Sequence, residues 1–255
     1  MGNPVVHFEL DGTDWKSLAG FYKELFGWHA EDIPEGNYAV IDTHAGSGIN
    51  GGIGQSQSGE PFGTFYVEGP DVQALLDKAE SLGGKTVVPV VEMMDPFPLT
   101  FAQFSDPQGN RIGLVKSDES QEGGVSPGDG VGVSWFEIIG PDPKALVEFY
   151  RQLFGWKEKA SDPGQAGSED IPGGFEYHQV ETGAGKGIDG GIGSSPDGQG
   201  HVTVYAEVDD IQKYLEVAES LGGNTVVPIT TIAQTTFAQF ADPQGIVFGL
   251  FKAQM

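Results

Sequence analysis

The feature that most constrains this chain of 255 residues is that one sequence pattern occurs in it twice. The segment Phe-Tyr-x-x-Leu-Phe-Gly-Trp at 21–28 returns at 149–156, a spacing of 128 residues. A second segment, Phe-Ala-Gln-Phe-x-Asp-Pro-Gln-Gly, stands at 101–109 and again at 237–245, a spacing of 136. Stacked solenoid repeats are roughly 20 to 50 residues long, so this repeat is too long for one. We therefore predict two copies of one domain, in which each residue can be compared with its counterpart.

A glycine-rich segment, Gly-Ile-x-Gly-Gly-Ile-Gly, also occurs twice, at 48–54 and 187–193, a spacing of 139. Because the spacing changes along the copies, we expect loops where residues are inserted or deleted. The segment lacks a following Gly-Lys-Ser/Thr and a following helix signal, so a phosphate-binding loop is not expected. Close packing of strands, or room for a ligand, explains these glycines better.

The composition excludes several functional classes. There is no cysteine, which rules out disulfides, thiolate nucleophiles and cysteine-based metal sites. The net charge of −24 argues against nucleic acid as a partner and indicates an acidic surface, with attraction of a cationic ligand as the alternative. No signal-like segment and no apolar run of about 18 residues occurs, so we expect a cytoplasmic protein without a membrane partner.

Strand and helix signals alternate in the same order in both copies. Asp14 precedes a helix with apolar residues at three- and four-residue spacing up to Phe26, and Gly27 is expected to end it in a left-handed conformation. A second helix follows Asp71, and Asp-Pro-Gln-Gly at 106–109 predicts a turn that joins two strands in a hairpin. The predicted fold class is α+β, built from four βαβββ modules.

The boundary between the copies is a stretch rich in glycine, serine and acidic residues. This stretch, 118–130, shows no apolar periodicity and is predicted to be a linker. The two domains are expected at 3–117 and 131–253. We expect each to form a curved eight-stranded sheet with helices outside and a cavity inside.

The order of the modules and their motifs resembles the vicinal oxygen chelate superfamily, which includes glyoxalase I, extradiol dioxygenases, and fosfomycin and bleomycin resistance proteins. The likeness rests on the Phe-Tyr-x-x-Leu-Phe-Gly-Trp and Asp-Pro-Gln-Gly segments in each copy. The tandem arrangement is similar to the two-domain glyoxalase/bleomycin-resistance-like proteins of actinobacteria. The resemblance implies two such domains, and because one scaffold carries many chemistries, it leaves the function open.

The resemblance also implies where a divalent metal would bind. The implied positions in the first copy are His7, Gly51 or Gly52, Thr64 and Gly113, and those in the second are Trp135, Gly190 or Gly191, Thr203 and Gly249. Glycine has no side chain to bind a metal, so one ligand of eight remains. We expect no catalytic metal; His7 is a weak metal candidate, and a divalent metal stays the lesser alternative. His7 is otherwise a cavity-facing hydrogen-bonding group or an ordinary, partly buried histidine.

Carboxylates at one position in both copies are the main catalytic candidates. Strand alternation places Glu9 on the same face as His7, and Glu137 on the same face as Trp135. An inward carboxylate can be a structural group bonded to its neighbours, an anchor for a ligand, or a general base. The sequence leaves these three roles open.

The other candidates lie on the strands that follow. The predicted ligand-binding residues are His7, Glu9, Thr64, Tyr66 and Gln103 in the first copy, and Trp135, Glu137, Thr203, Tyr205 and Gln239 in the second. Gly52 and Gly113 are expected to leave room for a bulky, partly aromatic ligand.

Three classes of function follow. The first is a monomer or homodimer that binds a small organic molecule in the cavity without a metal. The second is an enzyme, a glyoxalase-type lyase or isomerase, a hydroxylase or a dioxygenase, that uses a non-standard metal site or acid–base chemistry at Glu9 or Glu137. The third is a structural or interaction protein.

Overall fold

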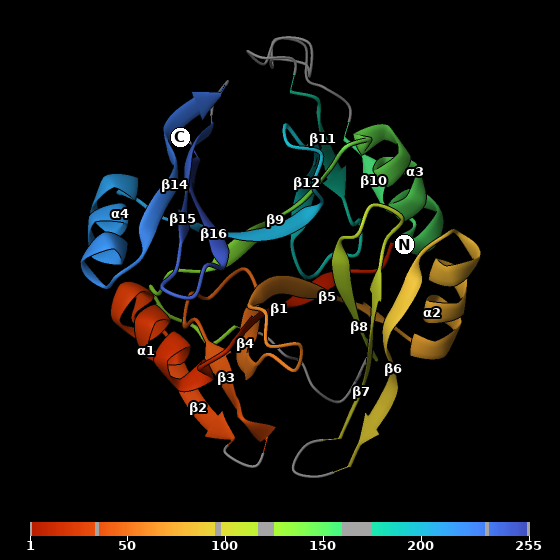
Figure 1. The fold of residues 1–255 in the computed structure, drawn as a ribbon, viewed down its shortest axis with the longest axis horizontal. Coiled ribbons are helices and arrows are strands. Elements are labelled where there is room, and N and C mark those ends of the chain that lie inside the picture. Colours follow the sequence, from red (N-terminus) through yellow and green to blue (C-terminus); the bar gives the residue numbers. More distant parts are fainter. Residues whose placement is uncertain are drawn as a thin grey trace. The chain divides into compact units, whose positions relative to one another are not determined.

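The computed structural model describes residues 2–33, 36–94, 98–116, 125–159, 175–232 and 235–253 (Figure 1). The strands of the first copy are β1 (Val5–Gly12), β2 (His29–Ile33), β3 (Tyr38–Asp42), β4 (Asn50–Gln55), β5 (Phe62–Gly69), β6 (Lys85–Met93), β7 (Leu99–Ser105) and β8 (Arg111–Lys116). Those of the second copy are β9 (Val133–Gly140), β10 (Lys157–Glu158), β11 (Tyr177–Glu181), β12 (Asp189–Ser194), β13 (His201–Glu207), β14 (Asn224–Ile232), β15 (Thr235–Ala241) and β16 (Val247–Ala253). The helices are α1 (Trp15–Phe26), α2 (Val72–Ser81), α3 (Pro143–Phe154) and α4 (Ile211–Ser220).

Two eight-stranded mixed sheets form, one from each copy. The first has the order β2-β3-β4-β1-β5-β8-β7-β6, and the second repeats it as β10-β11-β12-β9-β13-β16-β15-β14. Neither sheet is closed. Strand β1 pairs in parallel with β4, whereas β7 and β8 form the predicted antiparallel hairpin. The α+β class and the four βαβββ modules are therefore confirmed.

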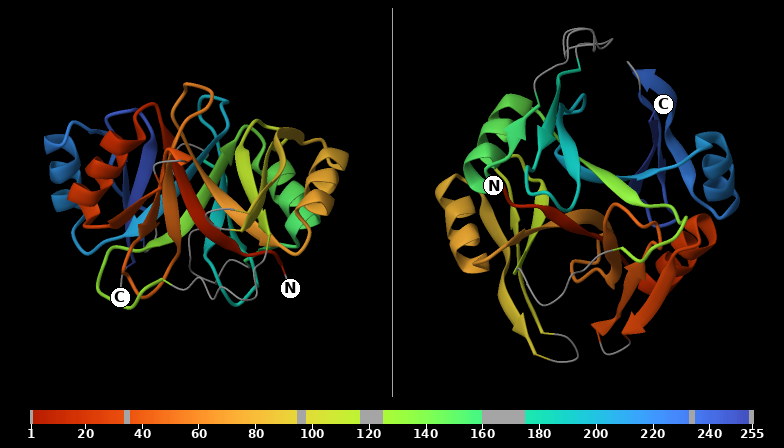
Figure 2. Two further views of the ribbon diagram at one scale, coloured as in Figure 1. Left: turned by 90° about the horizontal axis from the view of Figure 1, so that it is seen from below. Right: turned by 180° about the vertical axis from the view of Figure 1, so that it is seen from behind.

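Contacts group the modules differently from the sheets. Unit 1 comprises Met1–Val6, Thr64–Gly123 and Phe136–Val202, and unit 2 comprises His7–Gly63, Gly124–Trp135 and Thr203–Met255. Each unit thus combines one module of the first copy with one of the second. The side-by-side pairs α2 with α3 and α1 with α4 show this grouping (Figure 2). The domain boundaries at 3–117 and 131–253 stay a prediction, and part of the predicted linker, 118–124, lies outside the described residues.

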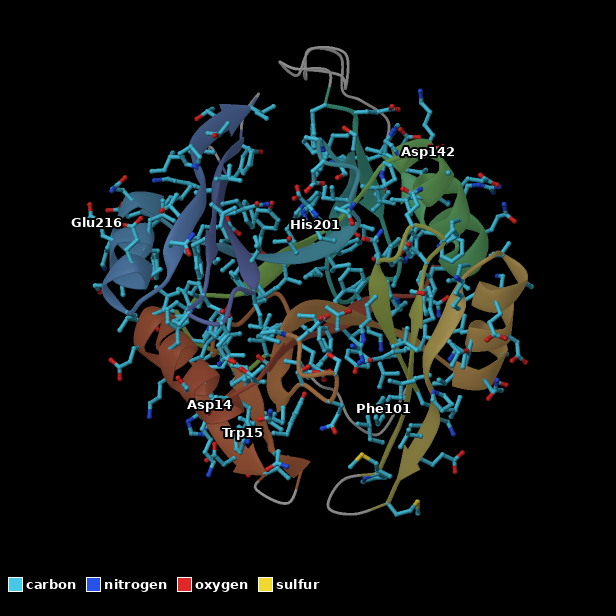
Figure 3. All side chains as sticks on the ribbon, in the orientation of Figure 1. Asp14, Trp15, Phe101, Asp142, His201 and Glu216 are labelled. Carbon is cyan, nitrogen blue, oxygen red and sulfur yellow. The ribbon has the colours of Figure 1, made fainter. Side chains whose placement is uncertain are left out.

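The helix ends follow the sequence signals. Asp14, labelled in Figure 3, caps α1 by accepting a hydrogen bond of 3.1 Å from the Ser17 amide, and Gly27 ends the helix with φ of 74°. Asp142 and Gly155 do the same for α3. Strand β2 carries no sequence signal of a strand, because its side chains are mostly exposed and lack the apolar alternation of a half-buried strand. It lies at the edge of the sheet, where polar residues are common.

In the core of each unit, aromatic rings form a cluster, and one ring packs against a glycine of the neighbouring strand. In unit 2, the rings of Phe8 and Trp28 lie 5.1 Å apart, and a Cβ atom on Gly51 would lie 2.5 Å from the Phe8 ring. In unit 1, Phe136 and Gly190 repeat this contact. Glycine at these positions lets a phenylalanine ring lie against the backbone of the neighbouring strand. Packing therefore explains Gly51 and Gly190, each the first glycine of the Gly-Gly pair in Gly-Ile-x-Gly-Gly-Ile-Gly.

The Asp-Pro-Gln-Gly turn of each copy binds a helix of the other copy within the same unit. In unit 2, Gln244 receives a hydrogen bond of 3.0 Å from the Asp14 amide and donates one of 2.8 Å to the Asp14 carbonyl. In unit 1, Gln108 makes the same two bonds, of 2.9 and 2.7 Å, with Asp142. The glutamine therefore fixes the first turn of a helix 230 or 34 residues away in sequence.

The aspartate of the same turn is buried against the tyrosine of the helix motif. Tyr150 donates a hydrogen bond of 2.8 Å to Asp106, and Tyr22 donates one of 3.1 Å to Asp242. Both aspartates are almost fully buried. The two motifs that carry the family resemblance therefore contact each other and maintain the fold.

A glycine inside helix α1 offers a direct stability test. A Cβ atom on Gly20 would meet no atom within 4 Å. Glycine in a helix interior costs roughly 0.5–1 kcal/mol relative to alanine. We expect Gly20→Ala to raise the free energy of unfolding by about that amount in urea titrations. A loss of stability would contradict the described environment of this glycine.

Candidate functional site

The first candidate cluster lies in unit 2 and joins β1 to β3. The imidazole Nε2 of His7 lies 3.0 Å from the Tyr38 hydroxyl, which in turn donates a longer hydrogen bond of 3.4 Å to Glu9. Strand β4 runs between β1 and β3 in the sheet. A Cβ atom on Gly52 would lie 1.6 Å from the Tyr38 hydroxyl oxygen. The absence of a side chain at Gly52 therefore lets Tyr38 cross β4 and reach both candidates on β1.

Burial lowers the pKa of His7 from 6.5 to about 4. The imidazole is thus neutral near pH 7 and can donate one hydrogen bond to Tyr38 while Tyr38 donates to Glu9. This arrangement joins an imidazole, a phenol and a carboxylate in one chain of hydrogen bonds.

The lowered pKa of His7 makes stability depend on pH in one direction. The unfolded chain binds a proton below pH 6.5, whereas the folded chain binds it only near pH 4. Stability should therefore fall as the pH drops from about 6.5 to about 4. We expect His7→Gln to remove this part of the pH dependence, measured by urea unfolding at several pH values. An NMR titration that gives His7 an ordinary pKa would contradict the prediction.

The second candidate cluster lies in unit 1 and joins β5, β7 and β8. Gln103 donates a hydrogen bond of 2.6 Å from Nε2 to the Tyr66 hydroxyl. Arg111 donates one of 2.7 Å from Nε to Oε1 of Gln103, and its Nη2 contacts the same oxygen. The guanidinium can only donate, so it fixes which end of the amide faces Tyr66. Gln103 and Tyr66 are 3% and 6% exposed.

Tyr66 crosses a glycine in the same way as Tyr38. Strand β8 lies between β5 and β7, and Tyr66 is paired with Gly113 in the register of β5 and β8. A Cβ atom on Gly113 would lie 2.3 Å from the Tyr66 ring. Gly52 and Gly113 were expected to leave room for a ligand, and this expectation is wrong. Two tyrosine side chains occupy the space over these glycines.

The second copy repeats the crossing with fewer polar groups. In unit 1, Tyr177 covers Gly191, and in unit 2, Tyr205 covers Gly249, where added Cβ atoms would lie 1.9 and 2.0 Å from the tyrosines. Gln239 donates a hydrogen bond of 2.6 Å to Tyr205. The counterpart of Arg111 in the second copy is Val247. No guanidinium therefore fixes the amide of Gln239 as Arg111 fixes that of Gln103.

The predicted site residues are thus brought together in part. His7 lies with Glu9 through Tyr38, Tyr66 lies with Gln103, and Tyr205 lies with Gln239. The remaining four are Thr64, Thr203, Trp135 and Glu137. Thr64 donates a hydrogen bond of 2.6 Å to the Arg111 carbonyl, and the buried hydroxyl of Thr203 has no partner among the described residues. Trp135 lies on β9 in unit 2, and Glu137 on β9 in unit 1.

Sequence reasoning missed Tyr38, Tyr177 and Arg111. The two tyrosines are counterparts at the spacing of 139, and each precedes a strand with glycines at alternate positions. That combination was a usable signal for a ring that lies across a strand. Arg111 has no counterpart, so comparison of the copies could not find it.

The side chains at the implied metal positions do not fit a metal. Tyr66 and Tyr205 cover Gly113 and Gly249, and Nε2 of His7 contacts Tyr38. In the described parts of the chain, no three histidine, cysteine, aspartate or glutamate side chains gather closely enough to hold a metal ion. Also within those parts, no helix combines the length and apolar character needed to span a bilayer.

Comparison with protein families agrees with this fold. Residues 132–250 match the family described as Glyoxalase/Bleomycin resistance protein/Dioxygenase superfamily. This stretch is therefore a domain of that superfamily, and the resemblance noted from its motifs is confirmed there. It is similar to the Mycobacterium bovis protein CFP32, whose name calls it a glyoxylase, with 26% identity over 96% of this chain and 92% of that protein. It is also similar to the anthracycline biosynthesis protein DnrV of Streptomyces peucetius, with 31% identity over 47% of this chain and 46% of DnrV.

Solved structures show the same fold. The Mn(II)-bound glyoxalase from Novosphingobium aromaticivorans aligns with a TM-score of 0.63 and 16% identity, covering 98% of this chain and 81% of that chain. The 2,3-dioxygenase LapB from Pseudomonas sp. KL28 aligns with a TM-score of 0.64 and 14% identity, covering 100% and 94%. These identities are low, so the likeness extends to the fold and not to the chemistry.

Proposed function

We propose that this protein binds a small organic molecule through polar side chains of the first sheet, and that it does so without a metal. The observation that carries the proposal is the Tyr66–Gln103–Arg111 network, in which Tyr66 and Gln103 are buried and Arg111 is partly exposed. Burying an amide and a phenol is costly, and such groups commonly give a binding site its specificity. The alternative is a network that only organises the sheet.

The first copy is the better candidate of the two. It has His7 and Arg111 where the second copy has Trp135 and Val247. Both differences replace a polar group by an apolar one, so the second copy has fewer groups that can orient a ligand. The implied metal positions do not fit a metal in either copy, which supports recognition by hydrogen bonds.

The names of the relatives suggest a class of ligand to test. Two are named for anthracycline biosynthesis, and each shares about 30% identity with half of this chain. Anthracyclines are fused aromatic rings with several oxygen atoms, which matches phenol, amide and guanidinium donors beside aromatic side chains. We therefore propose an oxygenated aromatic natural product as the ligand.

Two exchanges test the proposal. Gln103→Leu removes the amide between Tyr66 and Arg111 and should weaken binding if that network holds the ligand. Glu9→Gln tests the cluster of unit 2. Glu9→Gln keeps the shape of the side chain and removes its charge. If Glu9 anchors the ligand, the affinity for the anthracycline doxorubicin should fall by about 1.5–3 kcal/mol in calorimetric titrations. Glu137→Gln is the matched control and should leave binding in the first copy unchanged.

Two outcomes of this experiment count against the proposal. A melting temperature changed by Glu9→Gln with the affinity unchanged would assign Glu9 a structural role. Loss of binding in EDTA, or stoichiometric metal in untagged protein, would contradict binding without a metal. If the proposal holds, the melting temperature should rise as the ligand concentration increases above the dissociation constant.

A second candidate function is catalysis, and the hydrogen-bond chain His7–Tyr38–Glu9 favours it. Its neutral imidazole, phenol and carboxylate could accept or supply a proton for a bound molecule. An enzyme of this kind should turn over a substrate in EDTA and lose its rate in both Glu9→Gln and Tyr38→Phe. A binding protein should show neither.

A further inference from the structure

Two loops, one in each unit, share one backbone conformation. Positive φ values occur at His44, Gly46 and Gly48 in unit 2 (49°, 68° and 82°), and at Gly183, Gly185 and Gly187 in unit 1 (65°, 73° and 75°). Each loop begins at a threonine bonded through its amide and hydroxyl to one side-chain oxygen, at 2.9 and 3.1 Å for Thr43 with Asn50 and at 2.8 and 3.0 Å for Thr182 with Asp189. Because the two loops match residue for residue, Ser47 occupies the backbone position of Lys186.

The strands beside the loops match as well. The Glu68 amide bonds to the Pro4 carbonyl at 2.9 Å in unit 1, and the Glu207 amide bonds to the Gly132 carbonyl at 3.1 Å in unit 2. Glu68 and Glu207 are therefore counterparts.

The two units differ in what faces these glutamates. In unit 1, the Lys186 ammonium lies 2.6 Å from the Glu68 carboxylate. In unit 2, serine replaces that lysine, and among the described residues no lysine or arginine pairs with Glu207. A pocket of about 140 Å³ lies beside Glu207, lined by Ala45, Ser47, Gly130, Gly132, Ser134 and Glu207. The matching loop of unit 1 borders a pocket of about 240 Å³ whose lining includes Lys186 but not Glu68. The buried hydroxyl of Ser134 in this pocket has no partner within the described residues.

We propose that this pocket of unit 2 binds a small primary alkylammonium ion. Its ammonium would take the place that the lysine ammonium has in unit 1, with Glu207 as the counter-ion and the Ser47 hydroxyl as an acceptor. Its short alkyl chain would lie along Ala45 and the two glycines. The net charge of −24 raises the local concentration of cations. Since Glu207 is exposed, its ion pair with the ammonium contributes little, and we expect weak binding.

Exchanging the residues at the two loop positions tests the proposal in the full-length protein. The probe is n-butylammonium, with neutral n-butanol as its control, titrated in 150 mM NaCl and followed by amide chemical shifts. In the wild type, we expect shifts confined to residues 45–48, 132–134 and 207. Ser47→Lys should fill the pocket and Glu207→Gln should remove its charge, so each should weaken binding at least tenfold.

The reciprocal variant distinguishes a built pocket from a general acidic surface. Lys186→Ser should create a second site, with a new set of shifts at residues 183–188 and at Glu68. The proposal is wrong if n-butanol causes the same shifts, or if they persist in Ser47→Lys or Glu207→Gln. Shifts spread over the whole acidic surface, or lost in 150 mM NaCl, would equally overturn it.

Discussion

Replacing Asp106 with asparagine is expected to lower the free energy of unfolding by about 2 to 4 kcal/mol. Oδ2 of Asp106 accepts hydrogen bonds of 2.8 Å from both Asn110 Nδ2 and the Tyr150 hydroxyl. Its Oδ1 accepts from the amides of Gln108 and Asn110 at 2.8 and 3.0 Å. The NH₂ group of the new asparagine would face a donor in either orientation. It would meet the backbone amides at the Oδ1 position, or Asn110 Nδ2 and the Tyr150 hydroxyl at the Oδ2 position. Urea unfolding followed by tryptophan fluorescence measures the loss.

The counterpart Asp242 provides the matched control. The counterpart of Asn110 is Ile246, so Oδ2 of Asp242 accepts a side-chain hydrogen bond only from Tyr22 among the described residues. The Tyr22 hydroxyl can turn and accept from the new NH₂ group, so Asp242→Asn should cost only about 1 kcal/mol. Equal costs for the two variants would contradict the role given to Asn110.

The cost of Asp242→Asn should also depend on pH. Burial raises the pKa of Asp242 above its ordinary value of 3.8. The stability contributed by this group is present below pH 3.8 and is lost as the pH rises through the raised pKa. Because asparagine cannot titrate, Asp242→Asn should cost less at pH 7 than at pH 4. A cost that is independent of pH would show that the carboxyl has an ordinary pKa.

Adding one methyl group at Gly113 is expected to destabilise the protein by about 3 kcal/mol. The new Cβ atom would lie 2.3 to 2.5 Å from three atoms of the Tyr66 ring. The ring cannot move away easily, because Gln103 holds its hydroxyl at 2.6 Å. Gly249→Ala should have a similar effect through Tyr205, which lies 2.0 Å from the added atom.

A double-mutant cycle identifies the tyrosine as the cause. Tyr66→Ala removes the ring, so Gly113→Ala should cost less than about 0.5 kcal/mol in that background. If Gly113→Ala is equally costly with and without the ring, the effect belongs to the backbone and not to the contact. The same cycle with Tyr205 and Gly249 provides an independent repetition.

Much of the fold could be predicted from the sequence because its signals are local. Asp14 and Gly27 fix the ends of α1, and Asp-Pro-Gln-Gly fixes a hairpin, through interactions that span a few residues. The edge strand β2 could not be predicted, since its exposed polar residues have no periodicity. The hydrogen bonds between Gln244 and the start of α1 could not be predicted either, because nothing near residue 244 in the sequence indicates a helix 230 residues away.

The candidate site could be predicted less completely, for a physical reason. Alternation along a strand places His7 and Glu9 on one face, but it does not show which side chain from another strand will reach them. Tyr38 reaches them only because Gly52 lies between, so the contact depends on three strands at once. A glycine in a strand was taken as empty space, whereas here it is the place where a large neighbour lies.

The way in which separate segments of the chain combine into each unit affects folding during synthesis on the ribosome. Unit 1 ends at residue 202, whereas unit 2 draws on His7–Gly63 and on Thr203–Met255. Helix α1 therefore waits for Asp242 and Gln244, and unit 2 cannot be completed before residues 203–255 leave the exit tunnel. At roughly 5–20 residues per second, that wait lasts about ten seconds or more, during which the apolar face of α1 is available to chaperones.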